Sequence, residues 1–286
     1  MKKLVLVFAA LFTMQHAMSQ GLSGDSWVKA KQSKQATIVV TYTDAPKFSE
    51  KVNGKYSGVC FDIMDSFTKF VKDKYGVTLN VSYRDLARSG DFDLFLNTVK
   101  ASSGGVFGLG DVTITDARKR VYNFSPPYFS NVAIMATHPS APKLSSMSNI
   151  AQEFAGMTAV VQKGTTHEKR MQEIKSKYFP SLQIETTTTF DQANQKVVAN
   201  PKYFTYVDFS TYMQVLEQNL KIERQTAGDQ KGESFGFIMP NNSDWTVPMN
   251  EFFAQNGGYT NSTEYRKILA TNLGNYVLRL LDAMNK

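Results

Sequence analysis

The alternation of short β-branched runs with helical segments most strongly constrains the fold of this 286-residue chain. The run at 37–42, TIVVTY, predicts a buried strand, and 62–75 carries apolar residues at helical spacing. Further strands are predicted at 77–83, 106–115 and 131–137, and a further helix at 92–99. Strands that alternate with helices indicate an α/β domain with a largely parallel sheet.

The same alternation restarts after residue 147 and predicts a second, smaller α/β unit. Its predicted strands and helices are, in chain order, 148–154 (helix), 157–162 (strand), a helix from 166 to about 177, 181–185 (strand), 190–199 (helix), 203–207 (strand) and 211–220 (helix). A strand at 233–239, a helix at 247–253 and one long amphipathic helix at 262–284 complete the chain. The chain is therefore expected to fold as two α/β lobes.

The first nineteen residues have the pattern of a secretory signal peptide. Lys2 and Lys3 precede an apolar run at 4–14, and small residues at 17–19 predict cleavage before Gln20. The run is too short to be a permanent membrane helix. We expect a soluble protein exported to the periplasm.

Composition excludes several classes of function. The single cysteine, Cys60, rules out an internal disulfide and a cysteine-based metal site, and its apolar neighbours predict a buried side chain. The net charge is +7 for the whole chain and +5 without the leader. Because the basic residues are scattered, we expect no nucleic-acid binding. We also expect a monomer without a cofactor.

Three polar features follow predicted strands, where ligands of open α/β sheets bind. Arg118 lies near the hydroxyl residue Thr113, a suitable receptor for a carboxylate. Thr165 and Thr166 open a helix, whose first N–H groups attract anions; the alternative is an ordinary helix cap. Asp208 follows the strand YFTYV and can bind a cation, or again cap a helix. Together, two anion receptors and one carboxylate match a zwitterion.

Several motifs resemble the bacterial family 3 solute-binding proteins, the periplasmic amino-acid-binding receptors of ABC importers. The pair TITDAR at 113–118 and FSPPY at 124–128 is similar to the family's T-I-T-x-x-R and F-S-x-P-Y elements. The stretch VQKGT at 161–165 resembles its strand-to-helix turn, and FGFIMP at 235–240 its return strand. The similarity runs from about residue 37 to the C-terminus.

That resemblance implies a two-lobed type II periplasmic binding protein with a ligand cleft between the lobes. Lobe 1 would comprise 20–136 and 230–286, and lobe 2 would comprise 137–229, with crossings near 133–137 and 226–235.

The same resemblance implies the roles of the cleft residues. Arg118 would bind an α-carboxylate with help from Thr113, Thr165 and Thr166, and Asp208 would bind the α-ammonium. The closed form would then be presented to a membrane permease.

The sequence departs from the family at the approach to this motif. Asp111 stands where a small residue is common, so that it either faces the ammonium or repels a second ligand carboxylate; a solvated loop position is the alternative. Tyr42, Asp44 and Phe48 are candidates for the aromatic or polar cap over the ligand.

Two other functions remain open at this point. Some proteins with this fold are dehydratases of cyclic carboxylates, which would need a general acid or base in the cleft. The histidines of the mature chain, His138 and His167, are expected to be structural or exposed. A free-standing sensor that docks on a membrane receptor is the second alternative.

Overall fold

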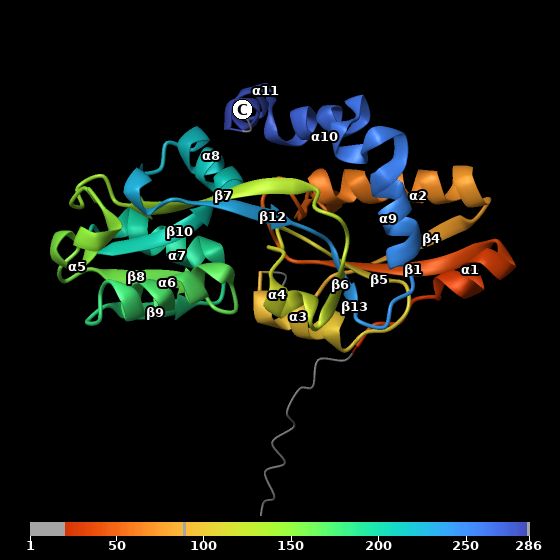
Figure 1. Ribbon diagram of the computed structural model, residues 1–286, viewed down its shortest axis with the longest axis horizontal. Coiled ribbons are helices and arrows are strands. Elements are labelled where there is room, and N and C mark those ends of the chain that lie inside the picture. The colour runs from red at the N-terminus through yellow and green to blue at the C-terminus, as the bar shows by residue number, and fades with distance from the viewer. Residues whose placement is uncertain (1–20, 88–89, 285–286) are drawn as a thin grey trace, which may run out of the picture.

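Two α/β lobes lie side by side in the computed structural model, which describes residues 21–87 and 90–284. Two long strands, β7 (Phe129–Thr137) and β12 (Gln230–Phe235), run between the lobes (Figure 1). The predicted leader at 1–19 lies outside the described residues. The two-lobed α/β fold expected from the sequence is confirmed.

The first lobe holds a five-stranded sheet with the order β4–β1–β5–β13–β6. Its strands are β1 (Gln35–Tyr42), β4 (Thr78–Arg84), β5 (Val106–Leu109), β6 (Tyr122–Phe124) and β13 (Ile238–Pro240). β1 pairs in parallel with β4 and β5, whereas β13 is antiparallel to β5 and β6. The sheet is therefore mixed rather than wholly parallel.

The second lobe holds a six-stranded sheet with the order β11–β7–β10–β8–β9, and β12 pairs with β7. Its other strands are β8 (Thr158–Gln162), β9 (Gln183–Thr187), β10 (Tyr203–Asp208) and β11 (Glu223–Arg224). β8 is parallel to β9 and β10, and β7 is antiparallel to β10. The parallel strands end at one edge, which brings their following loops together.

Helices cover both sheets. Their bounds are α1 (Trp27–Ser33), α2 (Val59–Tyr75), α3 (Phe92–Lys100), α4 (Asp116–Lys119), α5 (Ile150–Glu153), α6 (Thr166–Lys177), α7 (Phe190–Ala199), α8 (Phe209–Glu217), α9 (Thr246–Ala254), α10 (Thr263–Leu273) and α11 (Asn275–Met284). A small hairpin, β2 (Glu50–Val52) and β3 (Lys55–Ser57), precedes α2. Sequence analysis missed α1, this hairpin, α4, β6 and β11.

Two predicted elements are divided in the structure. The single helix expected at 262–284 is two helices, because Gly274 adopts φ +85° between α10 and α11. The apolar face expected for one continuous amphipathic helix does not continue past this break, since Tyr276 is 58% exposed. The strand expected at 233–239 is also divided, into β12 and β13.

The connections between the lobes lie at the first residues of β7 and the last of β12. Tyr128 donates its backbone N–H to the carbonyl of Phe235, and Phe129 is paired with Phe235. Residues 133–137 pair with β10 inside the second sheet, so the first crossing predicted there is placed too late in the chain. The predicted lobe boundaries themselves stay a prediction.

The predicted burial of the Cys60 side chain is confirmed: it is a free thiol inside the first lobe. Its Sγ lies 3.3 Å from the hydroxyl of Tyr128, and burial raises the pKa of the thiol to about 12. Across residues 21–87 and 90–284, no helix has both the length and the apolar character that crossing a membrane requires.

Candidate ligand cleft

A small cavity lies where loops of the two lobes meet. Its lining residues come from the ends of strands and the starts of helices: Phe92, Asp111, Thr113, Arg118, Thr165, Thr166, His167, Phe190 and Asp208. The remaining space is about 10 Å³, enough for about one water molecule. A solute as large as an amino acid can therefore enter only when the lobes move apart.

Arg118 reaches this cavity from α4, whose first turn is capped by the hydroxyl of Thr115. The guanidinium donates to the carbonyl of Thr113 at 3.0 Å and, across the cleft, to the carbonyl of Gly164 at 3.3 Å. It lies over the ring of Phe92 at 5.0 Å. Within the described part of the chain, no carboxylate forms an ion pair with Arg118. Burial lowers its pKa, and the nearby acids oppose that shift.

The start of α6 forms the facing wall. Thr165 is the helix cap: its hydroxyl accepts from the N–H of Glu168 at 3.3 Å and donates to the carbonyl of Gln162 at 2.7 Å. The hydroxyl of Thr166 lies 3.4 Å from that of Thr113 in the other lobe. The capping interpretation of Thr165 is thus confirmed, and Thr166 is the residue that reaches across.

Asp208 ends β10 and is 5% exposed. It makes no capping bond to α8, so the alternative of a helix cap does not hold for its side chain. Instead, the amide nitrogen of Asn131 donates to Oδ1 of Asp208 at 2.6 Å, and the amide oxygen of the same side chain accepts from the N–H of Phe209 at 3.1 Å. Asn131, from β7, therefore fixes the position of the carboxylate.

Asp111 lies beside Asp208 and is not a solvated loop residue, since only 9% of it is exposed. It follows β5 in the first lobe, whereas Asp208 belongs to the second, so the pair spans the cleft. Burial, and then the charge of Asp208, raise the pKa of Asp111 to about 8. Both carboxyl groups line the same cavity, so each acid opposes the ionisation of its neighbour across the cleft.

His167 was expected to be structural or exposed, but it is buried and lines the cavity. Its Nδ1 lies 2.9 Å from a guanidinium nitrogen of Arg170, which can only donate. Because Nδ1 faces a donor, a ring hydrogen is assigned to Nε2, 3.5 Å from Oδ1 of Asp208. Nε2 has no hydrogen-bond partner among the described residues. Arg170 itself is paired with Glu233 at 2.5 Å.

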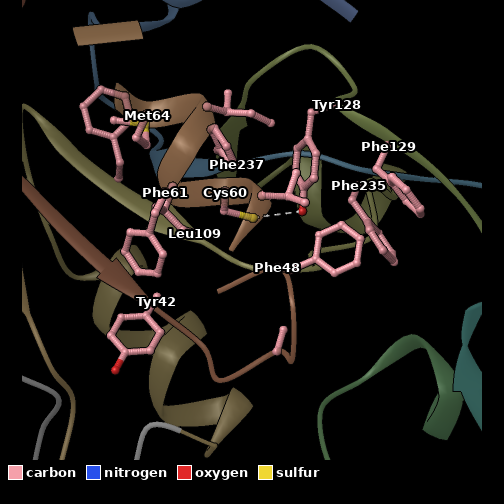
Figure 2. Packing of buried hydrophobic residues seen from close by; sticks show 14 of the residues in the cluster. Tyr42, Phe48, Cys60, Phe61, Met64, Leu109, Tyr128, Phe129, Phe235 and Phe237 are labelled. Carbon is pink, nitrogen blue, oxygen red and sulfur yellow. Dashed lines mark hydrogen bonds between the residues drawn. The ribbon is translucent and has the colours of Figure 1, made fainter. Parts of the chain in front are cut away.

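Tyr42 and Phe48 do not reach this cavity, which corrects the prediction that they cap a ligand. Tyr42 lies on the same face of β1 as Ile38 and Val40, and packs edge-on against Phe61. Phe48 has no exposed surface, and its ring lies 4.9 Å from that of Phe129 (Figure 2). Both side chains belong to the core.

The aromatic walls of the cavity are Phe92 and Phe190, which sequence analysis did not single out. Each is the first residue of a helix, at 92 in α3 and at 190 in α7. The ring of Phe190 packs at 5.8 Å against that of His167. Each stands at the start of a predicted helix that follows a predicted strand, and this position in the sequence could have indicated that both face the cleft. Among the described residues, no group of three or more acids, histidines and cysteines is arranged to hold a metal ion.

Comparison of the whole chain with solved structures gives clear matches. An ancestral arginine-binding protein bound to arginine matches with a TM-score of 0.67 at 21% identity, over 83% of this chain and 98% of that one. An ABC uptake transporter substrate-binding protein from Streptococcus pneumoniae with bound histidine matches with 0.67 at 17% identity, over 87% and 96%. The chain has the fold of the amino-acid-binding proteins.

A third match with this fold is the ancestral amino acid-binding protein AncCDT-1, a precursor of cyclohexadienyl dehydratase. Its TM-score is 0.65 at 20% identity, over 83% of this chain and 95% of that one. No protein-family model and no curated protein matches the chain. The likeness establishes the fold of the amino-acid-binding proteins. Because the identities are low, it does not extend to the ligand.

Proposed function

We propose that this protein is an exported receptor that binds a small zwitterionic solute, an amino acid, by closure of its two lobes. In this proposal Arg118 of lobe 1 binds the α-carboxylate, with Thr113, Thr165 and Thr166 beside it. Asp208 of lobe 2 binds the α-ammonium. The closed form then delivers the solute to the membrane permease of an ABC importer.

One observation carries the proposal: a guanidinium without a carboxylate partner and a fixed carboxylate line the same small cavity from opposite lobes. Arg170, which contacts the cavity residue His167, is already paired with Glu233. Arg118 is therefore the cation available to an incoming carboxylate. Charge-assisted bonds contribute about 1.5–3 kcal/mol each, and two or three of them are sufficient for micromolar binding.

Fold neighbours support the class of ligand. The three matched proteins are described as arginine-bound, histidine-bound and amino acid-binding. The periplasmic location and the permease partner rest on the leader predicted at 1–19 and on the resemblance of the cleft motifs. Mass spectrometry of the exported protein tests the location, because the mature chain should begin at Gln20.

Calorimetry on variants tests the binding site. After a thermal-shift screen of the twenty amino acids, Arg118→Ala should weaken binding of the stabilising amino acid by at least ~2 kcal/mol, about thirtyfold. Lys119→Ala is the matched control, because this exposed residue is the next one on α4. Wild-type affinity in Arg118→Ala would reject the carboxylate site.

A second candidate function, that of a dehydratase, is favoured by one observation. Asp111 lines the cleft, and burial together with the charge of Asp208 raises its pKa to about 8, the direction that a general acid at neutral pH requires. One fold neighbour is described as a precursor of a dehydratase. Incubation with a prephenate-like cyclic carboxylate separates the two functions: turnover supports the enzyme, and stabilisation by an amino acid without turnover supports the receptor.

A further inference from the structure

The second residue of α6, His167, is 2% exposed and lines the cavity with a ring nitrogen, Nε2, that has no partner among the described residues. We infer that His167 is a specificity-determining residue, which donates a hydrogen bond from Nε2 to a neutral oxygen on the side chain of the bound amino acid. Such a ligand carries a hydroxyl or a carboxamide group. This inference rests on the proposed function and adds the class of amino acid that the same cleft selects.

Contacts with neighbouring side chains fix this imidazole ring. Its Nδ1 lies 2.9 Å from a guanidinium nitrogen of Arg170, which can only donate, so Nδ1 accepts and Nε2 carries a hydrogen. Arg170 is held in turn by Glu233 at 2.5 Å. The ring stacks on that of Tyr206 with an interplanar angle of 25° and packs at 5.8 Å against that of Phe190. The position and the tautomer of the donor are therefore set before a ligand arrives.

Within the described chain, no group accepts from the Nε2–H of His167. Oδ1 of Asp208 lies 3.5 Å from Nε2, beyond the range of about 2.7–3.2 Å that a good N–H···O bond requires. That oxygen already accepts from Asn131 at 2.6 Å, which opposes its movement toward the ring. Because buried polar groups of native proteins are nearly always hydrogen-bonded, a fixed donor left over in the ligand cleft points to an acceptor on the ligand.

The acids of the cavity restrict that acceptor to a neutral group. Asp111 and Asp208 both line the cavity, and Asp208 is the acid beside Nε2. A side-chain carboxylate that accepted from His167 would therefore lie close to Asp208 and be repelled. A side-chain ammonium or guanidinium has no acceptor to offer. A hydroxyl or a carboxamide accepts from Nε2 and can also donate to a neighbouring carboxylate, so it suits both kinds of group.

Three groups of the cleft then divide the ligand between them. Arg118 binds the α-carboxylate, Asp208 binds the α-ammonium, and His167 binds the oxygen of the side chain. The rings of Phe92 and Phe190 also line the cavity and supply apolar contact. An amino acid with an apolar side chain of the same size keeps that contact but leaves the donor of His167 unpaired, so it binds more weakly.

Amino acids of similar shape test the inference on the mature protein. Calorimetry compares serine with alanine, threonine with valine, asparagine with leucine, and glutamine with methionine. In at least one pair the wild type should bind the polar member at least about tenfold more tightly. No preference for the polar member in any pair, or binding of charged amino acids alone, would overturn the inference and leave the amino-acid receptor intact. Binding of none of the twenty amino acids would overturn the proposed function, and the inference with it.

Variants then assign the preference to the donor. His167→Phe keeps an aromatic ring against Tyr206 and should lower the preference about tenfold by weakening only the polar member. Equal weakening of both members would mean a structural role and would overturn the inference. His167→Gln can accept from Arg170 and still donate into the cleft, so it should keep part of the preference; complete loss there would also count against the donor. His138→Phe, at a histidine that does not line the cavity, is the control and should bind as the wild type does.

Discussion

At the scale of single residues, the cleft depends on Asn131. This side chain is 2% exposed and bonds to Asp208, to Glu233 and to the backbone N–H of Phe209. Its amide nitrogen therefore lies between the two acids, Asp208 and Glu233, and donates to both. No other described residue bonds to all three.

Replacing Asn131 should therefore be costly. Asn131→Ala removes a hydrogen bond from the buried carboxylate of Asp208 and leaves the buried N–H of Phe209 without its acceptor, and we expect a loss of about 2–4 kcal/mol in the free energy of unfolding. Urea titration at neutral pH measures this loss. Asn123→Ala, which removes an amide from the other lobe that bonds only to the carbonyls of Asn241 and Ser243, is the control and should cost less. Equal losses would contradict the role given to Asn131.

Asp111 should make stability depend on pH. Its pKa is near 3.8 when unfolded and is raised to about 8 when folded, so it contributes stability below pH 3.8 that is lost as the pH rises through about 8. We expect the melting temperature of Asp111→Asn to exceed that of the wild type increasingly between pH 5 and 8, and by a constant amount above pH 8. A difference of 1 kcal/mol corresponds to about 2–4 °C. A constant difference across this range would show that Asp111 does not keep its proton.

The candidate site residues that lie at the cleft carry their signal locally in the sequence. Arg118 and Asp208 stand at fixed positions after apolar strands, so short motifs placed both at the cleft. Tyr42 was misplaced because its direction depends on which face of β1 packs against α2. His167 was undervalued because its neighbour Asp208 lies far away in sequence, and their contact depends on how β10 and α6 pack.

At the scale of secondary structure, glycines set the ends of helices. Gly76 ends α2 with φ +64°, and its N–H bonds to the carbonyl of Lys72 at 2.9 Å. Gly76 directly follows the helical pattern at 62–75, whereas Gly274 lies inside the single amphipathic helix predicted at 262–284. Periodicity alone continues through a glycine, but a left-handed or extended φ interrupts the hydrogen bonds of the helix.

A substitution at Gly76 tests this end of α2. A Cβ there would touch nothing within 4 Å, so the only cost of Gly76→Ala is that of the left-handed backbone, about 1 kcal/mol. Gly76→Asn should recover part of that loss, because asparagine tolerates this conformation. Chemical denaturation of both variants gives the comparison. If alanine and asparagine destabilise equally, the positive φ is not the cause.

At the scale of the whole molecule, direct contacts hold the lobes together around a nearly filled cleft. Gln162 of β8 donates across the cleft to the carbonyl of Gly90 at 2.6 Å, and Lys47 pairs with Glu217 of α8 at 2.6 Å. Lys163 lies 3.5 Å from Asp93 of α3. These contacts favour the closed form even before a ligand adds its own, and so they set part of the apparent affinity.

Gln162 allows this contribution to be measured, because it does not line the cavity. Gln162→Ala removes one neutral hydrogen bond between the lobes, worth about 0.5–1.5 kcal/mol, together with the bond to the carbonyl of Thr188 inside its own lobe. Because the first of these bonds favours closure, the apparent Kd should rise about threefold to tenfold. Small-angle scattering of the ligand-free variant should show a larger radius of gyration than that of the wild type, and saturation with ligand should remove the difference. Gln183→Ala, an exposed change in the same lobe, should alter neither quantity. A Gln162→Ala protein with unchanged affinity and unchanged radius would mean that closure does not depend on this contact.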